Sequence, residues 1–338
     1  MTAKRSFEAA SSLMSKAALR FGLCSVLLLS GQVLASSSLF YLEAMAVAGY
    51  SSGRDRVIFY SRSPEEAMQK PSLGFDYVLR ISGKSGDAAV AALQGRLAWN
   101  ADDRKVEPQL YNAYLKLKLG FGDLWAGHNR TELGLSSTLD SHALLLQTQA
   151  MNGFGFDRDW GLGFKKDLSW GGLGLALTTG SGMPLKLQGN YLVSARASWG
   201  VLERDNFTLG LSGAAGRTLN PMAHGGHLQE MELAGADAAF LWDRLENRVE
   251  VFLGKIGGRG AAAVLWRAGI NLFEEGRLKI EVQPEYWKNG SDSSFRLSAG
   301  LTYLASADMT FRALWERDPG GRDTRWIVQL YYYRRLNF

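Results

Sequence analysis

The last fifteen residues of the chain alternate in side-chain character with a period of two. In residues 324–338, TRWIVQLYYYRRLNF, one face of an extended segment carries Trp326, Val328, Leu330, Tyr332 and Leu336, and the other face is mainly polar. A period of two predicts a β-strand. An apolar face with aromatic residues near both ends suits a strand that meets lipid on one side and water on the other. The edge strand of a soluble β-sandwich would show the same pattern, so the rest of the chain has to distinguish the two folds.

The first 35 residues have the pattern of an export signal. Basic residues come first, the apolar stretch 21–29 follows, and Val33-Leu34-Ala35 offers a small-residue cleavage site before Ser36. We therefore expect residues 1–35 to be removed and residues 36–338 to form the folded protein. The only cysteine, Cys24, lies in this segment, so the mature chain has neither disulfides nor Cys-x-x-Cys metal sites.

Removal of the signal also removes most of the excess positive charge. Of the 38 basic and 33 acidic residues of the whole chain, four and one lie in the signal, which leaves 34 and 32. A formal charge of +2 on the mature chain gives no support to nucleic-acid binding.

Alternation and turn signals predict sixteen strands after the signal. They cover residues 40–50, 73–82, 89–100, 109–119, 122–129, 159–167, 172–180, 189–200, 206–216, 231–242, 246–255, 261–273, 277–288, 294–304, 308–317 and 324–337. Connections after even-numbered strands are short, whereas the long ones, 51–72, 130–158 and 217–230, all follow odd-numbered strands. Transmembrane barrels have short turns at one end and longer loops at the other. The pattern predicts an all-β fold, a transmembrane antiparallel up-and-down β-barrel, with 14 or 18 strands as alternative counts.

The aromatic residues favour the barrel over the sandwich. If odd strands rise and even strands descend, many aromatic side chains fall near the two ends of the strands. Those expected at the outer interface are Trp99, Trp160, Trp266, Tyr286, Trp287, Phe295, Trp315 and Trp326. Those expected at the inner interface are Trp199, Phe207, Phe240, Trp242, Phe273, Tyr303, Phe311 and Phe338. Aromatic rings concentrate at both boundaries of a membrane, and a soluble sandwich has no reason to place them so.

With these features the chain resembles the Gram-negative outer-membrane porins over essentially its whole mature length. The resemblance rests on the signal, the alternation of short and long connections, a longest loop after the fifth strand, and the terminal residues 331–338. That terminal segment, with Tyr332, Leu336 and Phe338, resembles the signal read by the barrel-assembly machinery. The resemblance implies a location in the bacterial outer membrane, contact with outer-membrane lipid, and a homotrimer as the assembly.

The strand face opposite the apolar one would line a water-filled pore. Its twelve basic residues are Arg80, Arg96, Lys116, Lys118, Lys165, Arg196, Arg248, Arg267, Lys279, Arg296, Arg312 and Arg325. Its seven acidic residues are Glu43, Asp76, Asp237, Glu250, Glu281, Glu285 and Glu316. A basic excess concentrates anions, which predicts a weak anion preference. The alternative is a solvated wall on which neighbouring charges, such as Lys279 and Glu281, mainly neutralise one another.

The longest connection, residues 130–158, is partly apolar at Leu144-Leu145-Leu146 and should pack against another part of the protein. Folded inward, as the porin resemblance implies, it would narrow the pore and set Glu132, Asp140 and Asp157 opposite wall arginines. Folded outward, it would cap the barrel or contact a neighbouring subunit.

Two clusters contain the residue types of other chemistry. Asp140-Ser141-His142 contains a nucleophile and a base, but neighbours in sequence do not form a catalytic triad unless an orienting third residue meets them in space. His224, His227 and Glu230 could hold a metal ion, although histidines in an exposed loop are more often simple polar residues. Phosphate-binding loops and zinc-ligand clusters are absent from the sequence, so we expect no cofactor, no metal and no catalytic residue.

The leading hypothesis is a porin for passive diffusion of small hydrophilic or anionic solutes, without enzymatic activity. A second hypothesis is a barrel that acts as a scaffold for a partner such as a periplasmic multihaem cytochrome; any haem would belong to the partner, because the chain has no Cys-x-x-Cys-His. The third is an outer-membrane hydrolase.

Overall fold

The computed structural model describes residues 35–62, 69–83, 86–219 and 227–336. The expected signal lies outside these residues except for Ala35, with which the first strand begins. Phe338 and His224 also lie outside the described residues.

Sixteen long strands make up the barrel wall. They are β1 (Ala35–Ser51), β3 (Ser72–Gly83), β4 (Gly86–Asn100), β5 (Lys105–Leu119), β6 (Gly122–Arg130), β7 (Arg158–Leu168), β8 (Gly171–Thr178), β9 (Tyr191–Trp199), β10 (Phe207–Leu219), β11 (Leu228–Trp242), β12 (Leu245–Ile256), β13 (Arg259–Leu272), β14 (Leu278–Asn289), β15 (Asp292–Leu304), β16 (Met309–Asp318) and β17 (Asp323–Leu336). Each overlaps one of the predicted strands, so the predicted count of sixteen is confirmed.

In the described parts of the connections lie four short helical turns and one further strand. The strand is β2 (Arg56–Ile58), and the turns are η1 (Gly134–Ser137), η2 (Gln149–Asn152), α2 (Leu202–Asp205) and η3 (Glu274–Gly276). Within the described ranges, the chain forms no helix of the length and apolar character that a membrane crossing requires.

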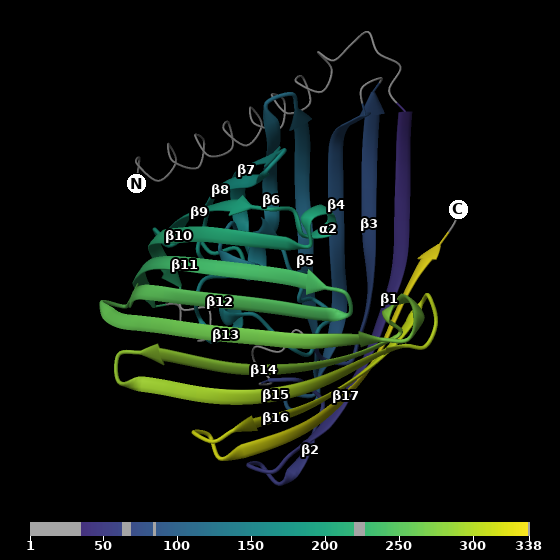
Figure 1. Ribbon diagram of the computed structural model, residues 1–338, viewed down its shortest axis with the longest axis vertical. Helices are drawn as coiled ribbons and strands as arrows, with labels where there is room; N and C mark the ends of the chain where they lie inside the picture. Colours follow the sequence, from purple (N-terminus) through teal and green to yellow (C-terminus); the bar gives the residue numbers. More distant parts are fainter. Residues whose placement is uncertain (1–34, 63–68, 84–85, 220–226, 337–338) are drawn as a thin grey trace, which may run out of the picture.

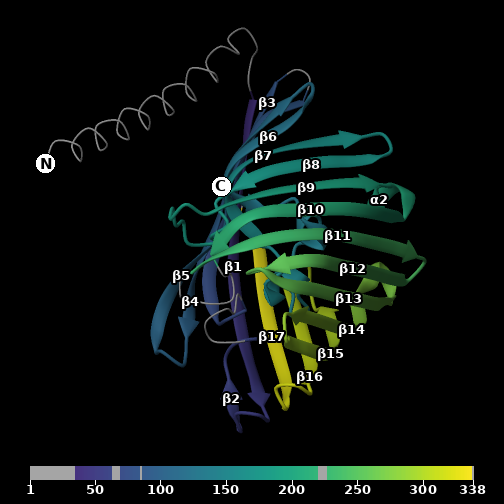
Figure 2. The same ribbon diagram turned by 90° about the vertical axis from the view of Figure 1, so that its left-hand side faces the viewer.

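The sheet closes on itself, because every long strand pairs antiparallel with its neighbours along the chain and β1 pairs with both β3 and β17. The closing pair runs from Phe40 opposite Leu336 to Ser51 opposite Arg325. Figure 1 shows β1 between β3 and β17, and Figure 2 shows β1 beside β17 from another side. Closure gives each long strand a partner on both sides, which is the condition for a sheet to span a membrane.

The alternation predicted for the last strand is confirmed by the exposure of its side chains. Trp326 and Leu330 are 59% and 43% exposed on the outside, whereas Ile327 and Gln329 are each 1% exposed on the inside. Apolar side chains form the outer face of most other strands as well, among them Leu97, Leu162, Leu211 and Leu253. The outside of the barrel is therefore an apolar belt of the kind that faces lipid.

The first strand begins five residues before its predicted start. Ser36, Ser37 and Ser38 show no alternation of apolar and polar side chains, but they pair with Ile81, Arg80 and Leu79 of β3. Backbone hydrogen bonds extend the strand where the side-chain pattern gives no signal. A register shift between Gln94 and Gly95 of β4 likewise leaves one additional residue, Tyr111, in β5. This β-bulge places Tyr111 and Asn112 on the same inner face.

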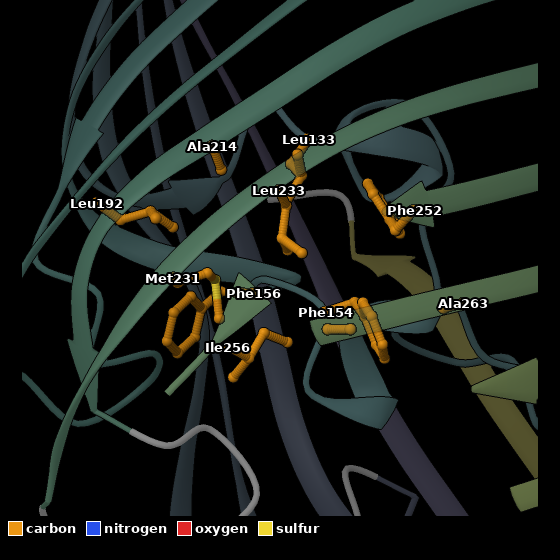
Figure 3. Packing of buried hydrophobic residues seen from close by; sticks show 11 residues of the cluster. Leu133, Phe154, Phe156, Leu192, Ala214, Met231, Leu233, Phe252, Ile256 and Ala263 are labelled. Atoms are coloured by element: carbon orange, nitrogen blue, oxygen red, sulfur yellow. The ribbon is translucent and has the colours of Figure 1, made fainter. Parts of the chain in front are cut away.

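Among the described residues, two apolar clusters inside the barrel join the long loop to the wall. In the first, Leu133, Phe154 and Phe156 of the loop pack against inner residues of β9–β13, including Leu192, Met231, Leu233, Phe252 and Ile256 (Figure 3). In the second, Leu145 and Leu146 of the loop pack against Met45, Val47, Leu314, Ile327 and Tyr331 of β1, β16 and β17. Ile327, the one aliphatic residue on the polar face of the last strand, is thus a docking site for the loop.

Candidate pore constriction

Residues 131–157, called the constriction loop below, connect β6 to β7 and contact inner residues on opposite sides of the barrel. On one side, the carboxylate of Glu250 on β12 accepts hydrogen bonds from two loop amides, Leu135 N at 2.6 Å and Gln149 N at 3.1 Å. Nearby, the carbonyl oxygen of Gln147 accepts from Arg267 Nη2 at 3.1 Å and from Gln283 Nε2 at 3.0 Å. The Glu250 carboxylate therefore holds both helical turns of the loop, and Arg267 and Gln283 hold the residues just before the second turn.

On the opposite side, the loop is held through His142. Its Nε2 lies 3.0 Å from Glu43 Oε1 on β1 and 3.1 Å from Gln94 Nε2 on β4. The Tyr111 hydroxyl donates to the His142 carbonyl oxygen at 3.3 Å, and its ring meets the imidazole edge-on at a centroid distance of 4.3 Å. Together with the packing of Leu145 and Leu146, these contacts fix the tip of the loop, residues 139–150, to the wall.

The local sequence makes this path possible at Gly134. Its φ of 53° lies in the left-handed region, where glycine is favoured. A Cβ at this position would collide with the Glu250 carboxylate and the Phe252 ring. Any larger residue would push the loop away from the carboxylate that holds it.

The loop acids Asp140 and Asp157 do not lie opposite the wall arginines proposed from the sequence. Asp140 forms ion pairs with Arg130 at 2.6 Å and Arg158 at 3.1 Å, and Asp157 pairs with Arg158. These arginines are the last residue of β6 and the first of β7, so the acids are neutralised at the base of the loop. Burial by itself would raise the pKa of Asp140, but the positive charges of Arg130 and Arg158 lower it well below its ordinary value.

Glu132 differs from the other two loop acids, because it faces wall cations without a close ion pair among the described residues. It lines a cavity of about 210 Å³ at the short-turn end of the barrel together with Lys165 and Arg196. Its side chain is buried, and burial raises its pKa above the ordinary value.

The wall charges proposed from the sequence form a ladder across β14–β17. Arg296 Nη1 lies 2.7 Å from Glu285, and Arg325 Nη2 lies 2.5 Å from Glu316. Arg62, from the connection after β1, extends the ladder because its Nη2 lies 3.0 Å from Glu285 and its Nη1 donates to the carbonyl oxygen of Met151 in the loop. A second segment of the chain therefore reaches the constriction loop.

Most other wall charges are paired on the inner face. Arg96 contacts Glu43 at 3.3 Å, and Arg196 forms a two-point pair with Asp237 at 2.6 and 2.9 Å. Glu281 lies 2.9 Å from Lys279. At these positions the wall therefore agrees with the alternative expectation, in which neighbouring charges neutralise one another.

Arg267 and Arg312 on the inner face make no ion pair with any described residue. Arg267 donates from Nε to Gln283 at 2.7 Å and also to the loop, and Arg312 donates to Gln329 at 2.9 Å with its guanidinium 5.5 Å from the centre of the Tyr331 ring. Both are hydrogen-bonded by neutral groups, so their charge is not cancelled by direct contact.

The remaining cations of the predicted pore lining lie toward the short-turn end. Arg80 is exposed on β3, Lys116 Nζ lies 6.0 Å from the centre of the Tyr114 ring, and Lys118 Nζ lies 3.7 Å from Asp87. At the chain terminus, Tyr332 pairs with Ala44 and Leu336 with Phe40 in the β1–β17 register.

The residues of the hydrolase hypothesis do not form a nucleophile and base pair. The Ser141 hydroxyl donates to Asp157 Oδ1 at 3.2 Å, whereas the His142 Nε2 is engaged with Glu43. In the part of the chain that the structure describes, no group of three or more His, Cys, Asp or Glu side chains could hold a metal ion.

Sequence reasoning missed Arg62, Arg130 and Arg158 as parts of the site. Arg130 and Arg158 lie at the two ends of the loop range and could have been found by pairing the loop acids with the nearest basic residues. No sequence signal points to Arg62, which reaches the constriction loop only through the return of a distant segment.

The sequence matches no protein-family model and no curated protein. Among solved structures, the chain is similar to OmpF of Salmonella typhi in complex with daunomycin, with a TM-score of 0.63, 11% identity, and coverage of 90% of this chain and 98% of that one. It is also similar to the anion-selective porin of Comamonas acidovorans, with a TM-score of 0.61, 12% identity, and coverage of 89% and 100%. The trimer form of OmpT, an outer-membrane protein of Vibrio cholerae, gives 0.60, 9%, and 89% and 100%. The chain therefore has the fold of the bacterial outer-membrane porins, a class whose barrels lie in the outer membrane.

Proposed function

We propose that this protein is a porin, a water-filled channel through which small hydrophilic solutes diffuse passively. The observation that carries the proposal is the constriction loop, which is fixed to Glu250 on one side of the barrel and to Glu43 on the other. Cavities of about 390 and 210 Å³, each lined by both polar and apolar side chains, lie on the longer-loop side and the short-turn side of it. A narrowed passage between two wetted vestibules is the arrangement that a diffusion channel needs.

We further propose a weak preference for anions. Arg267 and Arg312 support it, because each places an unpaired positive charge on the inner face beside or near the loop. The loop acids Asp140 and Asp157 are held by Arg130 and Arg158 and so offer little net negative charge against them. A small excess of fixed positive charge in a narrow channel concentrates anions.

The loop also bears on the scaffold hypothesis. A partner enclosed by the barrel would occupy the space in which Leu145, Leu146 and His142 contact the wall. We therefore favour a channel over a scaffold. The trimer form among the similar solved structures supports a homotrimer for this chain, and the terminal residues Tyr332 and Leu336 support assembly by the general barrel-assembly machinery.

The test is reconstitution of the purified mature chain in planar lipid bilayers. A porin gives stepwise, stable unitary conductance, and a salt gradient across the bilayer gives a reversal potential of the sign expected for anions. Absence of conductance steps would contradict the channel. A reversal potential of clear cation selectivity would contradict the anion preference alone.

A further inference from the structure

The cavity of about 210 Å³ at the short-turn end of the barrel contains a buried carboxylate without a partner. The side chain of Glu132 lines this cavity and is 6% exposed, and it makes no ion pair or hydrogen bond with any described residue. Its two oxygens keep accessible surface toward the cavity. A buried charge without a partner is costly, so Glu132 would stabilise a cationic group that entered the cavity.

The Glu132 carboxylate is held in place from the backbone and from the wall. The Thr131 hydroxyl donates to the Phe156 carbonyl oxygen at 2.6 Å, and Leu133 is 1% exposed in the apolar cluster that Figure 3 shows. The carboxylate itself rests on Gly174 of β8, where a Cβ would collide with it. Glu132 is therefore fixed in the cavity by the path of the loop.

Two basic side chains flank Glu132 and have N–H groups to spare. In the strand registers, Gly174 lies opposite Lys165 of β7 and Arg196 of β9. Lys165 makes no ion pair or hydrogen bond with any described residue. Arg196 binds Asp237 through Nε and Nη2, which leaves its Nη1 without an acceptor among the described residues. Lys165 Nζ and Arg196 Nη1 both keep accessible surface, so an anionic group beside Glu132 would meet two donors.

The charges around the cavity favour neither sign. The lining has three basic residues, Lys165, Arg196 and Arg248, and three acidic residues, Glu132, Asp167 and Glu203. Behind it, Asp237 binds Arg196, Glu246 binds both Arg248 and Lys279, and Asp123 lies opposite both Lys118 and Lys165. Lys116 and Arg130 act on Glu132 from further away. A ligand with one charge of each sign fits these surroundings better than a simple anion or a simple cation.

We propose that this cavity is a binding subsite for small zwitterionic amino acids. The α-ammonium group donates to the Glu132 carboxylate, and the α-carboxylate accepts from Lys165 Nζ and Arg196 Nη1. A cavity of about 150 Å³ can hold benzene, so this one has room for glycine, alanine or serine. The subsite rests on the proposed channel function and names a solute class for it, since a small amino acid at low concentration is retained at the channel more strongly than an ion of one sign and the same size.

The test is saturation-transfer-difference NMR on the detergent-solubilised full mature chain, with L-alanine as the probe. Propionate is the same molecule without the ammonium group, and ethylammonium is the same molecule without the carboxylate. L-alanine is expected to bind saturably and about tenfold or more tightly than either analogue, the usual effect of losing one hydrogen-bonded contact to a charged group. Equal binding of L-alanine and ethylammonium, or of L-alanine and propionate, would overturn the subsite.

Two variants test the contacts separately. Glu132→Gln keeps the length of the side chain and is expected to weaken L-alanine binding about tenfold and to remove its advantage over propionate. Lys165→Gln should instead reduce the advantage of L-alanine over ethylammonium. The control is Asp103→Asn, which removes a carboxylate from the exposed turn 101–104 and should leave binding unchanged.

Two results with these variants count against the assignment. If Glu132→Gln binds L-alanine as tightly as Asp103→Asn does, Glu132 is not the ammonium ligand. If the parent protein binds no L-alanine and Lys165→Gln binds ethylammonium, Lys165 itself occupies Glu132 and no subsite exists.

The two proposals fail in different ways, because the binding measurement does not depend on conduction. A chain that conducts in planar bilayers without binding L-alanine overturns the subsite and leaves the channel standing. A chain that binds L-alanine with the expected preferences but gives no conductance steps overturns the channel and leaves the binding site standing.

Discussion

The tip of the constriction loop is the part of the protein whose attachment can be tested most directly. Leu146 is 5% exposed and packs in the cluster that includes Leu314 and Ile327. Shortening it to alanine removes apolar contact from both the loop and the wall. A buried Leu→Ala change costs about 2–5 kcal/mol. We expect a cost at the lower end of this range, about 2 kcal/mol, because the tip can relax into the interior without unfolding of the barrel. A cost of this size raises the equilibrium constant for opening of the tip about thirtyfold.

The assay is amide hydrogen exchange followed by mass spectrometry on the detergent-solubilised protein. Peptides that cover residues 139–150 report the opening of the tip, since the Leu144 amide donates to the Ser141 carbonyl oxygen at 3.0 Å only while the turn is folded. Leu146→Ala should speed exchange there about thirtyfold and leave the strands unchanged. Leu211→Ala is the control, because Leu211 is 70% exposed on the outer face of β10.

One result would refute the reasoning. If exchange of residues 139–150 is the same in Leu146→Ala as in Leu211→Ala, the apolar cluster does not hold the loop tip. The tip would then have to be held by its polar contacts, among them those of His142 with Glu43 and of Gln147 with Arg267.

Three further predictions concern conduction and pH. Deletion of residues 135–150 should raise unitary conductance, because it removes the contacts of the loop with Glu250, Glu43 and Arg267; unchanged conductance would show that another segment sets the bore. Arg267→Gln combined with Arg312→Gln should lower the anion-to-cation permeability ratio by up to about thirtyfold, since each charge shifts the energies of an anion and a cation about 8 Å away in water by roughly 0.5 kcal/mol in opposite directions; a reversal potential equal to that of the parent protein would contradict this. Since the pKa of Asp140 is lowered, its pairing with Arg130 and Arg158 is fully present above the ordinary value of 3.8 and is lost only as the pH falls through the lowered value. The pKa of Glu132 is raised, so its contribution to loop docking is present below 4.5 and is lost as the pH rises through the raised value. The protection factors of the loop amides, which are corrected for the intrinsic pH dependence of exchange, should therefore fall as the pH rises above 4.5, and Glu132→Gln should abolish that change whereas Asp140→Asn should not.

Much of the barrel could be predicted from the sequence because the alternation that specifies each strand lies within a short stretch of residues. Each strand must show lipid one face and water the other, so Trp326, Val328 and Leu330 could be assigned to the outside from their spacing alone. The charged residues on the opposite face of each strand follow from the same parity. Closure of the sheet could be predicted as well, because it is the way in which a sheet satisfies its backbone in lipid.

The contacts inside the barrel could not be predicted in this way, because they join residues that are far apart in the chain. The clamp of Leu135 and Gln149 on Glu250 spans more than one hundred residues, and Arg62 meets Glu285 across more than two hundred. The bulge at Tyr111 has no side-chain signature, yet it sets which residues of β5 meet His142. The pairing of Asp140 with Arg130 depends on the turn of the loop back to its own base.

The double hydrogen bond to Glu250 has a consequence for how such a barrel can diversify. Since the amides of Leu135 and Gln149 are anchored on one carboxylate, the ends of the intervening segment 136–148 stay together whatever lies between them. We expect that the length and the side chains of that segment can change without disturbing the registers of the surrounding strands. New solute preferences can thus arise by exchange of thirteen residues, while the cylinder that carries them stays the same.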